Sequence, residues 1–521
     1  MKRQFMRVGD REVHFRVAGE GPTIVLCHSI PGSSAQLATL MDALAHDACV
    51  IAVDAPGFGS SSPLETACPE IASYAAALAE TLETLGINSA LIYGQQFGAS
   101  VALQLALDHP ECVTALILVS SPRPMLEDLA AALPSPHLDG SHLLAAWTYT
   151  RDSHLFLVEG SRNPSDLPTA EQLHAEVMDL LRAGPAQLTA LRAHLNFDAP
   201  RARSLVATPI HDVPQNAAPD CLRTLASNLV VLRSPERPVS KNLSVGTLTH
   251  DYVDTEFGQV LIRRIEHSGD GTLPLVMLHA SPGSGAQLVD LMHNFARSRT
   301  VIALDTLGHG ESDPAPWPAP HIEDYALPVV EVIGKLLEDR AVELYGTHTG
   351  AFVAVETAIL LKEQVARIVL DGVGIWNEVE RNDLIANYAP DFVPRHDGTH
   401  LVQLWAQMRD MTLFWPWYNR TASGVISVPP ITALALHEWA LEAFKSGVNY
   451  PRAYQAAFRY LARDRLPLLS RPVLLCDDPQ DVLASSVATA LRLLPAGRIA
   501  KVSADSRTRS SRIAEFLDYG R

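Results

Sequence analysis

An internal repeat is the feature that most constrains how this chain can fold. The stretch His28-Ser-Ile-Pro-Gly-Ser-Ser-Ala-Gln-Leu37 returns 251 residues later as His279-Ala-Ser-Pro-Gly-Ser-Gly-Ala-Gln-Leu288. A second pair of stretches, beginning at Val53 and Leu304, keeps the pattern Asp-x-x-Gly-x-Gly at the same offset. Because order and spacing both survive, the sequence predicts a tandem duplication with the same fold in each half.

Short apolar runs alternate with helical stretches in both halves, and this alternation is typical of an α/β fold with a doubly wound sheet. Each half opens with residues that alternate as half-buried strands do, at Glu12–Val17 and Val260–Ile265. Continuous apolar runs after them predict buried parallel strands. These runs cover 23–27, 50–53, 90–93 and 115–119 in the first half and 275–278, 301–304, 342–345, 367–370 and 472–478 in the second.

Domain boundaries follow from changes in composition. A stretch with several Pro and Ser residues predicts a linker at 234–247. We therefore expect a first domain at 1–233 and a second at 248–521. Helical segments without a strand pattern, at about 122–200 and 374–466, predict a helical cap inserted in each domain.

The overall composition is that of a globular protein. Of the 521 residues, 47% are hydrophobic and 19% are charged. The net charge of −17 argues against nucleic acid or an anionic membrane surface as the main partner. We therefore expect a small-molecule substrate. The start lacks the apolar run of a signal peptide and no run of about 18 apolar residues predicts a membrane span, so we expect a cytoplasmic protein.

A glycine-flanked turn in the second half is the strongest candidate for a functional site. In Leu344-Tyr-Gly-Thr-His-Thr-Gly-Ala351 an apolar strand runs into a turn with His348 at its apex. The equivalent turn of the first half has Gln96 at its apex. Imidazole titrates near neutral pH and can act as a general acid or base, whereas glutamine is neither nucleophile nor base.

Each half resembles the α/β-hydrolase superfamily. The resemblance is carried by the H-x-x-P-G-S loop, the D-x-x-G-x-G loop and the glycine-flanked turn, which matches the G-x-S-x-G nucleophile elbow except at its apex. It implies two tandem doubly wound sheets, each with a helical cap. The second half resembles a subgroup with Gly-x-His-Thr-Gly at the elbow. This superfamily includes esterases, lyases, dehalogenases, cofactor-free oxygenases and non-catalytic receptors, so the fold alone does not give the function.

Members of this family carry nucleophile, acid and histidine in that chain order. The second half has His348 for the serine, Asp478 or Asp481 where the acid often lies, and no histidine near Ser503 to Ser506. The first half has Gln96 and no histidine between 227 and 238. We therefore expect the first domain to be a catalytically silent pseudoenzyme domain that packs against its partner copy, although its surviving cap motif leaves room for a ligand.

Asp371 is a second candidate catalytic residue. It ends the sixth strand of the second half, where the first half has Val119. A carboxylate there can fix the tautomer of His348 and stabilise its imidazolium form. The alternative interpretation is that Asp371 only caps the start of the inserted helical segment.

Backbone amides near the apex are candidates for an oxyanion hole. The N–H groups of Thr349 and of Ala280 or Ser281 would face a developing oxyanion in this fold. His279 precedes Ala280, and a role in fixing this loop is favoured over a catalytic role for its ring.

The second cap contributes candidate substrate-binding residues. The motif Asp397-Gly-Thr-His400 with Trp405 and Arg409-Asp410 repeats the first half's Asp139-Gly-Ser-His with Trp147 and Arg151-Asp152. The functional interpretation is that Arg409 receives an anionic substrate group, with Trp405 as an apolar wall and His400 beside it. The alternative, favoured because the first half keeps the same set, is a buried cap network.

Metal and cofactor motifs are weak in this sequence. It lacks an H-E-x-x-H motif and a dinucleotide-binding glycine fingerprint, and its six cysteines show no C-x-x-C spacing. A metal held by His348, His279 and His400 stays open as an alternative. We expect neither a cofactor nor a metal, and the oligomeric state is open.

The sequence thus favours a cofactor-independent enzyme, hydrolase-like or lyase-like, with a non-serine mechanism. His348 would act as general acid or base on a small carbonyl-containing, anionic substrate, with Asp371 orienting it. The reaction would be hydrolysis or a proton abstraction that leads to elimination or C–C cleavage. The alternative is a catalytically inactive pseudohydrolase that binds a small molecule.

Overall fold

The computed structural model describes residues 1–119, 135–156, 168–227, 245–269, 271–426 and 430–519. The chain divides into two compact units. The first unit comprises Met1–Pro136, Ser141–Lys241 and Pro394–Thr399, and the second comprises His137–Gly140, Asn242–Val393 and His400–Arg521. Most of the predicted linker (234–244) lies outside the described residues.

The first unit contains a seven-stranded sheet with the order β1-β2-β4-β3-β5-β6-β7. The first two strands form an antiparallel hairpin, and the strands from β4 to β7 run parallel to one another. The strands are β1 (Lys2–Val8), β2 (Arg11–Ala18), β3 (Thr23–Cys27), β4 (Cys49–Val53), β5 (Ala90–Gln95), β6 (Val113–Val119) and β7 (Ile210–Val213).

The second unit contains an eight-stranded sheet with the order β8-β9-β11-β10-β12-β13-β14-β15. As in the first sheet, the first two strands form a hairpin at one edge, and the next two lie in the reverse of their order in the chain. The strands are β8 (Leu248–Thr255), β9 (Gly258–Ile265), β10 (Leu275–Leu278), β11 (Val301–Leu304), β12 (Val342–Thr347), β13 (Val365–Asp371), β14 (Val473–Asp477) and β15 (Gly497–Lys501). The predicted fold class, two tandem doubly wound α/β sheets, is confirmed.

Helices cover both faces of each sheet, because parallel strands that are apolar on both sides must be buried on both sides. In the first unit, α2 (Ile71–Thr84) packs on α3 (Phe97–Asp108), and α1 (Ala38–Leu44) packs on α9 (Ala218–Ala226). In the second unit, α11 (Ile322–Leu337) and α12 (Thr349–Leu361) share one apolar core, whereas α10 (Val289–Phe295) and α19 (Ser506–Leu517) share another.

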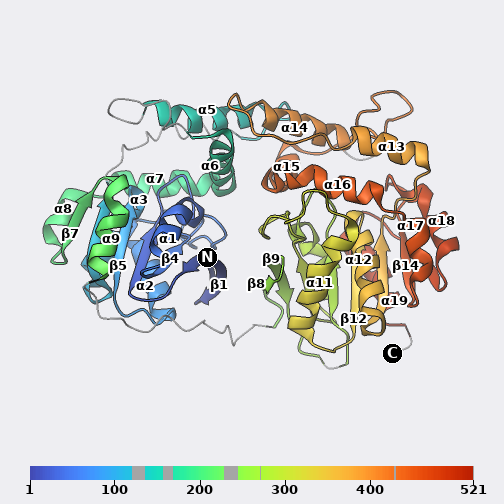
Figure 1. Ribbon diagram of the computed structural model, residues 1–521, viewed down its shortest axis with the longest axis horizontal. Helices are drawn as coiled ribbons and strands as arrows, with labels where there is room; N and C mark the ends of the chain where they lie inside the picture. The colour runs from blue at the N-terminus through green and yellow to red at the C-terminus, as the bar shows by residue number, and fades with distance from the viewer. Residues whose placement is uncertain (120–134, 157–167, 228–244, 270, 427–429, 520–521) are drawn as a thin grey trace. The chain divides into compact units, whose positions relative to one another are not determined.

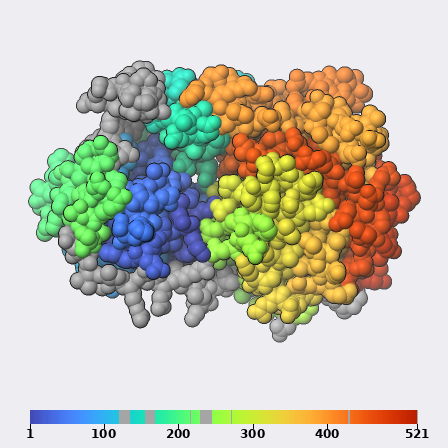
Figure 2. All heavy atoms as spheres, in the orientation of Figure 1, coloured from blue at the N-terminus to red at the C-terminus, as the bar shows by residue number. Residues whose placement is uncertain are grey.

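Helices inserted between β13 and β14 lie over the carboxyl ends of the second unit's strands (Figure 1). In this view α15 and α16 lie next to the sheet, with α13 and α14 above them, and α16 contacts α11, α12 and α13. Figure 2 shows their orange and red atoms above the yellow atoms of α11. The helices are α13 (Glu378–Asn387), α14 (Thr399–Met411), α15 (Ala433–Ser446), α16 (Asn449–Arg459) and α17 (Ala462–Arg465).

The corresponding insertion of the first unit, between β6 and β7, contains α5 (Ser141–Phe156), α6 (Ala170–Ala183), α7 (Pro185–Asn196) and α8 (Ala199–Leu205). Residues 120–134 and 157–167 of the predicted first cap lie outside the described part. None of the helices described in either unit is both long and apolar enough to cross a membrane.

Candidate active site

The backbone at His348 has the strained conformation of an exposed turn apex. Its φ is 49° and its ψ is −113°, and Gln96 in the first unit has nearly the same angles, 50° and −113°. A non-glycine residue with positive φ costs on the order of 1–3 kcal/mol, so the surrounding fold must impose this conformation. Both copies keep the strained turn although neither has serine at the apex.

Two glycines make this turn possible by allowing close backbone contacts. A Cβ atom on Gly346 would lie 2.2 Å from the carbonyl oxygen of Gly350. A Cβ atom on Gly350 would lie 2.4 Å from the carbonyl oxygen of Leu278, at the end of β10. The strand end, the turn and the first residues of α12 are therefore packed too tightly for any side chain at either position.

The imidazole of His348 is held by the carboxylate of Asp481. Its Nε2 lies 3.0 Å from Oδ2 of Asp481, and Oδ1 of the same carboxylate accepts a hydrogen bond of 2.7 Å from the backbone N–H of Leu483. The Cδ2–Nε2 edge of the ring lies against Gly372, where a Cβ atom would be 2.6 Å from Cδ2 of His348. The His348 side chain is 38% exposed and that of Asp481 is 15% exposed. Asp481 therefore orients the ring through Nε2, while the described residues provide no hydrogen bond to Nδ1, which is the nitrogen available to a bound molecule.

The charges around His348 favour its protonated form. Burial opposes that form, but the hydrogen bond and charge of Asp481 and the charge of Asp371 outweigh it and raise the pKa of His348 above its ordinary value. Burial likewise tends to raise the pKa of Asp481, whereas the hydrogen bond and charge of His348 produce a net lowering of that pKa. His348 and Asp481 thus form an imidazolium–carboxylate pair at and somewhat above the pH at which a free histidine loses its proton.

The structure corrects the predicted contact between His348 and the Asp371 carboxylate. Only the backbone of Asp371 meets the apex, since its carbonyl accepts a 2.9 Å hydrogen bond from the N–H of His348. Its carboxylate accepts hydrogen bonds from the Tyr345 hydroxyl (2.7 Å) and from the Arg509 guanidinium (2.5 and 2.7 Å). Within the described residues, no hydrogen bond joins this carboxylate to the ring of His348. Asp481, on the loop after β14, therefore holds the ring.

Arg509 is a member of this site that the sequence analysis missed. It lies in α19, just after the last strand, and its guanidinium joins Asp371 to Asp478, whose Oδ2 lies 2.5 Å away. Its Nε donates to the carbonyl of Ser503 at 2.9 Å. A guanidinium thus follows the last strand, where a family member would carry histidine. A search for any cation in the first turn of the last helix would have found it.

His279 fixes its loop, as the sequence favoured. Its Nε2 accepts a 3.0 Å hydrogen bond from the backbone N–H of Thr306, and its Nδ1 lies 2.7 Å from the carbonyl oxygen of Ala280. Both ring nitrogens are therefore engaged within the protein, which argues against the predicted contact of this ring with substrate. The amide of Thr349 follows the apex directly in sequence, and the role of the Thr349 and Ala280 amides as an oxyanion hole stays a prediction.

The predicted substrate-binding residues of α14 form a cap network. The side chain of His400 is buried beside Phe392, and the indole N–H of Trp405 donates to the carbonyl of Leu138 at 3.0 Å within the second unit. The guanidinium of Arg409 is 41% exposed and pairs with Asp410 at 3.1 Å. Figure 1 shows α15 and α16 between the sheet and α14, the helix that carries Arg409.

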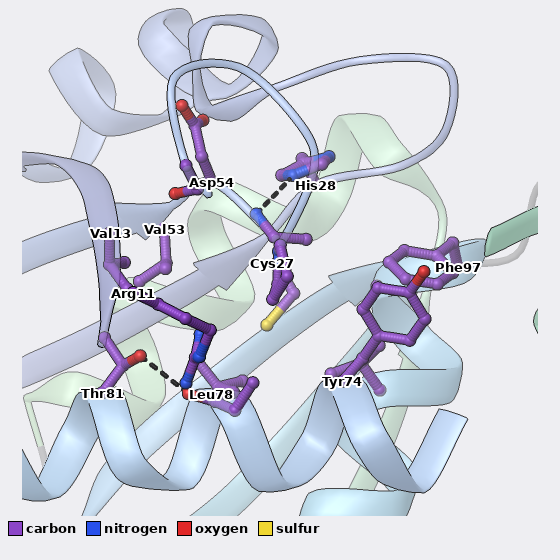
Figure 3. A pocket seen from close by; sticks show the side chains of 16 residues that line it. Arg11, Val13, Cys27, His28, Val53, Asp54, Tyr74, Leu78, Thr81 and Phe97 are labelled. Atoms are coloured by element: carbon purple, nitrogen blue, oxygen red, sulfur yellow. Dashed lines mark hydrogen bonds between the residues drawn. The ribbon is translucent and has the colours of Figure 1, made fainter. Parts of the chain in front are cut away.

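The first unit has a small cavity beside its sheet (Figure 3). Its walls include Cys27 and His28 from the end of β3, Tyr74 from α2 and Phe97 from the start of α3. The cavity volume is about 30 Å³, enough for about one water molecule. Burial raises the pKa of the Cys27 thiol to about 12, and His28 Nε2 accepts from the N–H of Ala55 at 3.0 Å. These observations support the interpretation that this unit is catalytically silent, which stays a prediction.

Among the residues described, no group of three or more His, Cys, Asp or Glu side chains is arranged to hold a metal ion. His279 and His400 are each buried in contacts of their own, so a convergence of these rings with His348 on one metal finds no support.

The chain belongs to the alpha/beta hydrolase fold family. The family model matches residues 22–202 and 274–415, which together are more than half of the chain.

Similarity to curated proteins is confined to segments. An uncharacterized protein of Mycobacterium tuberculosis, Rv2715, is 37% identical over 118 residues, which are 23% of this chain and 34% of that protein. A fluoroacetate dehalogenase of Burkholderia sp is 30% identical over 123 residues, 23% of this chain and 40% of that enzyme. Bifunctional epoxide hydrolase 2 of Rattus norvegicus is 37% identical over 117 residues, 21% of this chain and 20% of that enzyme. The chain thus matches well under half the length of each relative.

Among solved structures, the enol-lactonase from Burkholderia xenovorans LB400 matches 51% of this chain and 96% of its own, with 17% identity and a TM-score of 0.38.

Proposed function

We propose that the second unit is a cofactor-independent enzyme that uses His348 as a general acid and base on a small carbonyl compound. The observation that carries this proposal is the pairing of a strained apex histidine with Asp481, which orients one ring nitrogen and leaves the other available. Strained backbone clusters at functional sites, but Gln96 has the same strain in the first copy, so the ionisable ring paired with Asp481 carries the proposal. A catalytic imidazole held in this way resembles the histidine–carboxylate pair of hydrolase triads.

The raised pKa of His348 favours a particular order of proton transfers. The imidazolium form donates a proton first, to a carbonyl oxygen or a leaving group, and the resulting neutral ring then accepts one from water or from carbon. Asp481 stabilises the cation in each cycle, as the acid of a triad does. Both hydrolysis and a proton abstraction that leads to elimination or C–C cleavage fit this cycle.

The charge balance favours a neutral carbonyl substrate over the anionic one expected from the sequence. Asp371, Asp478 and Asp481 contribute three carboxylates, whereas Arg509 and protonated His348 contribute two cations. Arg409, the predicted anion receptor, is paired with Asp410 in the outer layer of the cap. An anionic group would therefore meet repulsion that the described residues near His348 do not offset.

The relatives support a hydrolase-like reaction. Their names include a fluoroacetate dehalogenase, a putative carbamate hydrolase and bifunctional epoxide hydrolases. Each matches only a part of this chain, so the substrate of this protein stays open.

The test is to incubate purified wild type and His348→Gln with a small-metabolite extract and to follow consumption and retention of compounds by mass spectrometry. Glutamine is the matched substitution, because the first copy already holds Gln96 in the same backbone conformation. We expect the wild type alone to consume a compound, with turnover falling by about 10²-fold or more in the variant.

Two outcomes would count against the proposal. Equal consumption by both proteins would remove His348 from the chemistry. Retention by both without consumption would favour the binding protein, the alternative that the two incomplete triads suggest.

A further inference from the structure

A chain of side-chain hydrogen bonds runs through the loops after β10 and β11 in the second unit. Oγ of Ser281 lies 3.2 Å from Nε2 of His309. Nδ1 of His309 lies 3.2 Å from Oγ1 of Thr306, which in turn lies 3.1 Å from Nε2 of His279. The chain ends where Nδ1 of His279 meets the carbonyl oxygen of Ala280.

The two backbone carbonyls in this network fix its direction. A carbonyl only accepts, so His279 carries its proton on Nδ1 and accepts at Nε2 from Thr306. Nδ1 of His309 lies 3.3 Å from the carbonyl oxygen of Leu307, so it too carries the proton, and its Nε2 accepts. The hydroxyl proton of Ser281 must therefore point at His309. The unshared electron pairs of Ser281 Oγ remain, which makes this oxygen a hydrogen-bond acceptor toward any bound molecule.

The first unit has other residues at the corresponding positions of its own loops. Its counterparts of Ser281, Thr306 and His309 are Ile30, Ala55 and Phe58. Only the histidine after the strand is common to both, and its ring packs against Phe58 at 5.5 Å as His279 packs against His309 at 5.3 Å. The copy with a titratable apex residue thus has polar residues at all three positions, whereas the other copy has apolar residues at all three.

Ser281 lies on the same rim as His348. Its loop follows β10, which pairs in parallel with β12, the strand that leads to the apex. The carbonyl oxygens of Leu278 and His279 lie against Gly350, two residues after His348. From the other side, the indole N–H of Trp439 in α15 donates to the carbonyl of Pro282 at 3.2 Å. Ser281 is therefore held between the sheet edge and the helices that cover it.

A role for Ser281 as a nucleophile does not fit these surroundings. A base that activates serine must take up its proton, but burial and the neighbouring His279 lower the pKa of His309 to about 3. His309 is 1% exposed, and its other nitrogen meets a hydroxyl and a carbonyl rather than a carboxylate. The imidazole therefore stays neutral and acts as a fixed acceptor.

We propose that Ser281 is a specificity-determining residue of the second unit, whose Oγ accepts a hydrogen bond from a hydroxyl or amino group of the substrate. This inference rests on the proposed function, because it places the donor group beside the carbonyl on which His348 acts. His309 is a positioning residue, since it holds the hydroxyl proton of Ser281 away from the substrate. The substrate class is thus a small carbonyl compound that carries an O–H or N–H donor close to its carbonyl group.

The test uses pairs of compounds that differ by one donor group: ethyl lactate and ethyl propionate, lactamide and propionamide, and alanine methyl ester and methyl propionate. Binding is followed by ligand-observed NMR competition and turnover by mass spectrometry. In at least one pair we expect the wild type to prefer the donor-bearing member by about tenfold or more, the range of one hydrogen bond left unmade. The preference should fall toward one in Ser281→Ala and in His309→Phe, which has the side chain that the first copy holds there.

Ser298→Ala is the matched control, because Ser298 lies before β11, at the opposite end of the strands, and should keep the wild-type preference. A preference that survives Ser281→Ala would overturn the proposal. So would a wild type that shows no preference, whether it binds both members of each pair equally or neither. Equal losses for both members in Ser281→Ala would point to a contact with water and would also overturn it.

His348→Gln separates this inference from the proposed function. A binding preference that depends on Ser281, seen together with turnover that survives His348→Gln, would refute the role of His348 and leave that of Ser281 in place.

Discussion

Replacing Asp481 by asparagine tests the central feature of the site, because it removes the charge beside His348 and keeps the shape of the side chain. The carboxylate and imidazole are 3.0 Å apart. At that distance a pair of unit charges interacts by about 1.4 kcal/mol at the dielectric constant of water and by about 5.5 kcal/mol at an effective value of 20. Since the His348 side chain is 38% exposed, solvent screening brings the interaction close to the smaller figure.

The loss of this interaction should lower the pKa of His348 in Asp481→Asn, because the imidazolium form loses the neighbouring charge that stabilises it. The assay is a pH titration of His348 by NMR of the histidine side chains, with His348→Gln to assign the signal. Asp371→Asn should shift the pKa less, because the Asp371 carboxylate is bound to Arg509 and not to the ring.

Asp477→Asn is the control, since this carboxylate lies at the end of β14, just before the loop that carries Asp481, and pairs with Lys501 on the surface. An unchanged pKa in Asp481→Asn, or a larger shift in Asp371→Asn, would refute the assignment of Asp481 as the partner of His348. The pH dependence of turnover should follow the same order. If protonated His348 is the acid, the alkaline limb of the wild-type profile moves to lower pH in Asp481→Asn.

Three further predictions concern stability and geometry. Gly372→Ala should destabilise the fold by about 1–3 kcal/mol and lower turnover by about tenfold or more, because Gly372 has a φ of +86° and a Cβ atom would displace the His348 ring. Thermal unfolding should show that part of the lost stability is regained when the same substitution is made in His348→Gln. The pKa of His309 is lowered to about 3 in the folded protein, so between about pH 6.5 and 3 the unfolded chain binds more protons at this residue than the folded protein does. The protein should therefore be about 2 kcal/mol less stable at pH 5 than at pH 7 because of His309. Urea unfolding at the two pH values should show a smaller acid loss for His309→Phe, and equal losses would contradict the neutral ring. Arg509→Leu should destabilise the second unit by about 3–5 kcal/mol by leaving two buried carboxylates without their cation, whereas exposed Arg507→Leu should change urea unfolding by less than about 0.5 kcal/mol.

The sequence by itself determined the repeated architecture and the location of the turn. Apolar runs such as 23–27 and 275–278 match β3 and β10, because strands buried on both faces leave little freedom for polar residues. Glycines at 346 and 350 indicated a tight turn with His348 at its apex, since close backbone contacts exclude every other residue there.

Only the tertiary structure decided which charges meet. Asp371 ends β13, and Asp478 and Asp481 come just after β14, at the same end of the parallel strands, so the sequence could not distinguish among them as partners of His348. Their pairing depends on Arg509, which comes from α19 and binds the first two carboxylates, leaving Asp481 for the ring. Spacing along a chain records which residues are near the edge of a sheet. The direction in which a side chain points, and the cation that it reaches, depend on helix packing that local patterns do not encode.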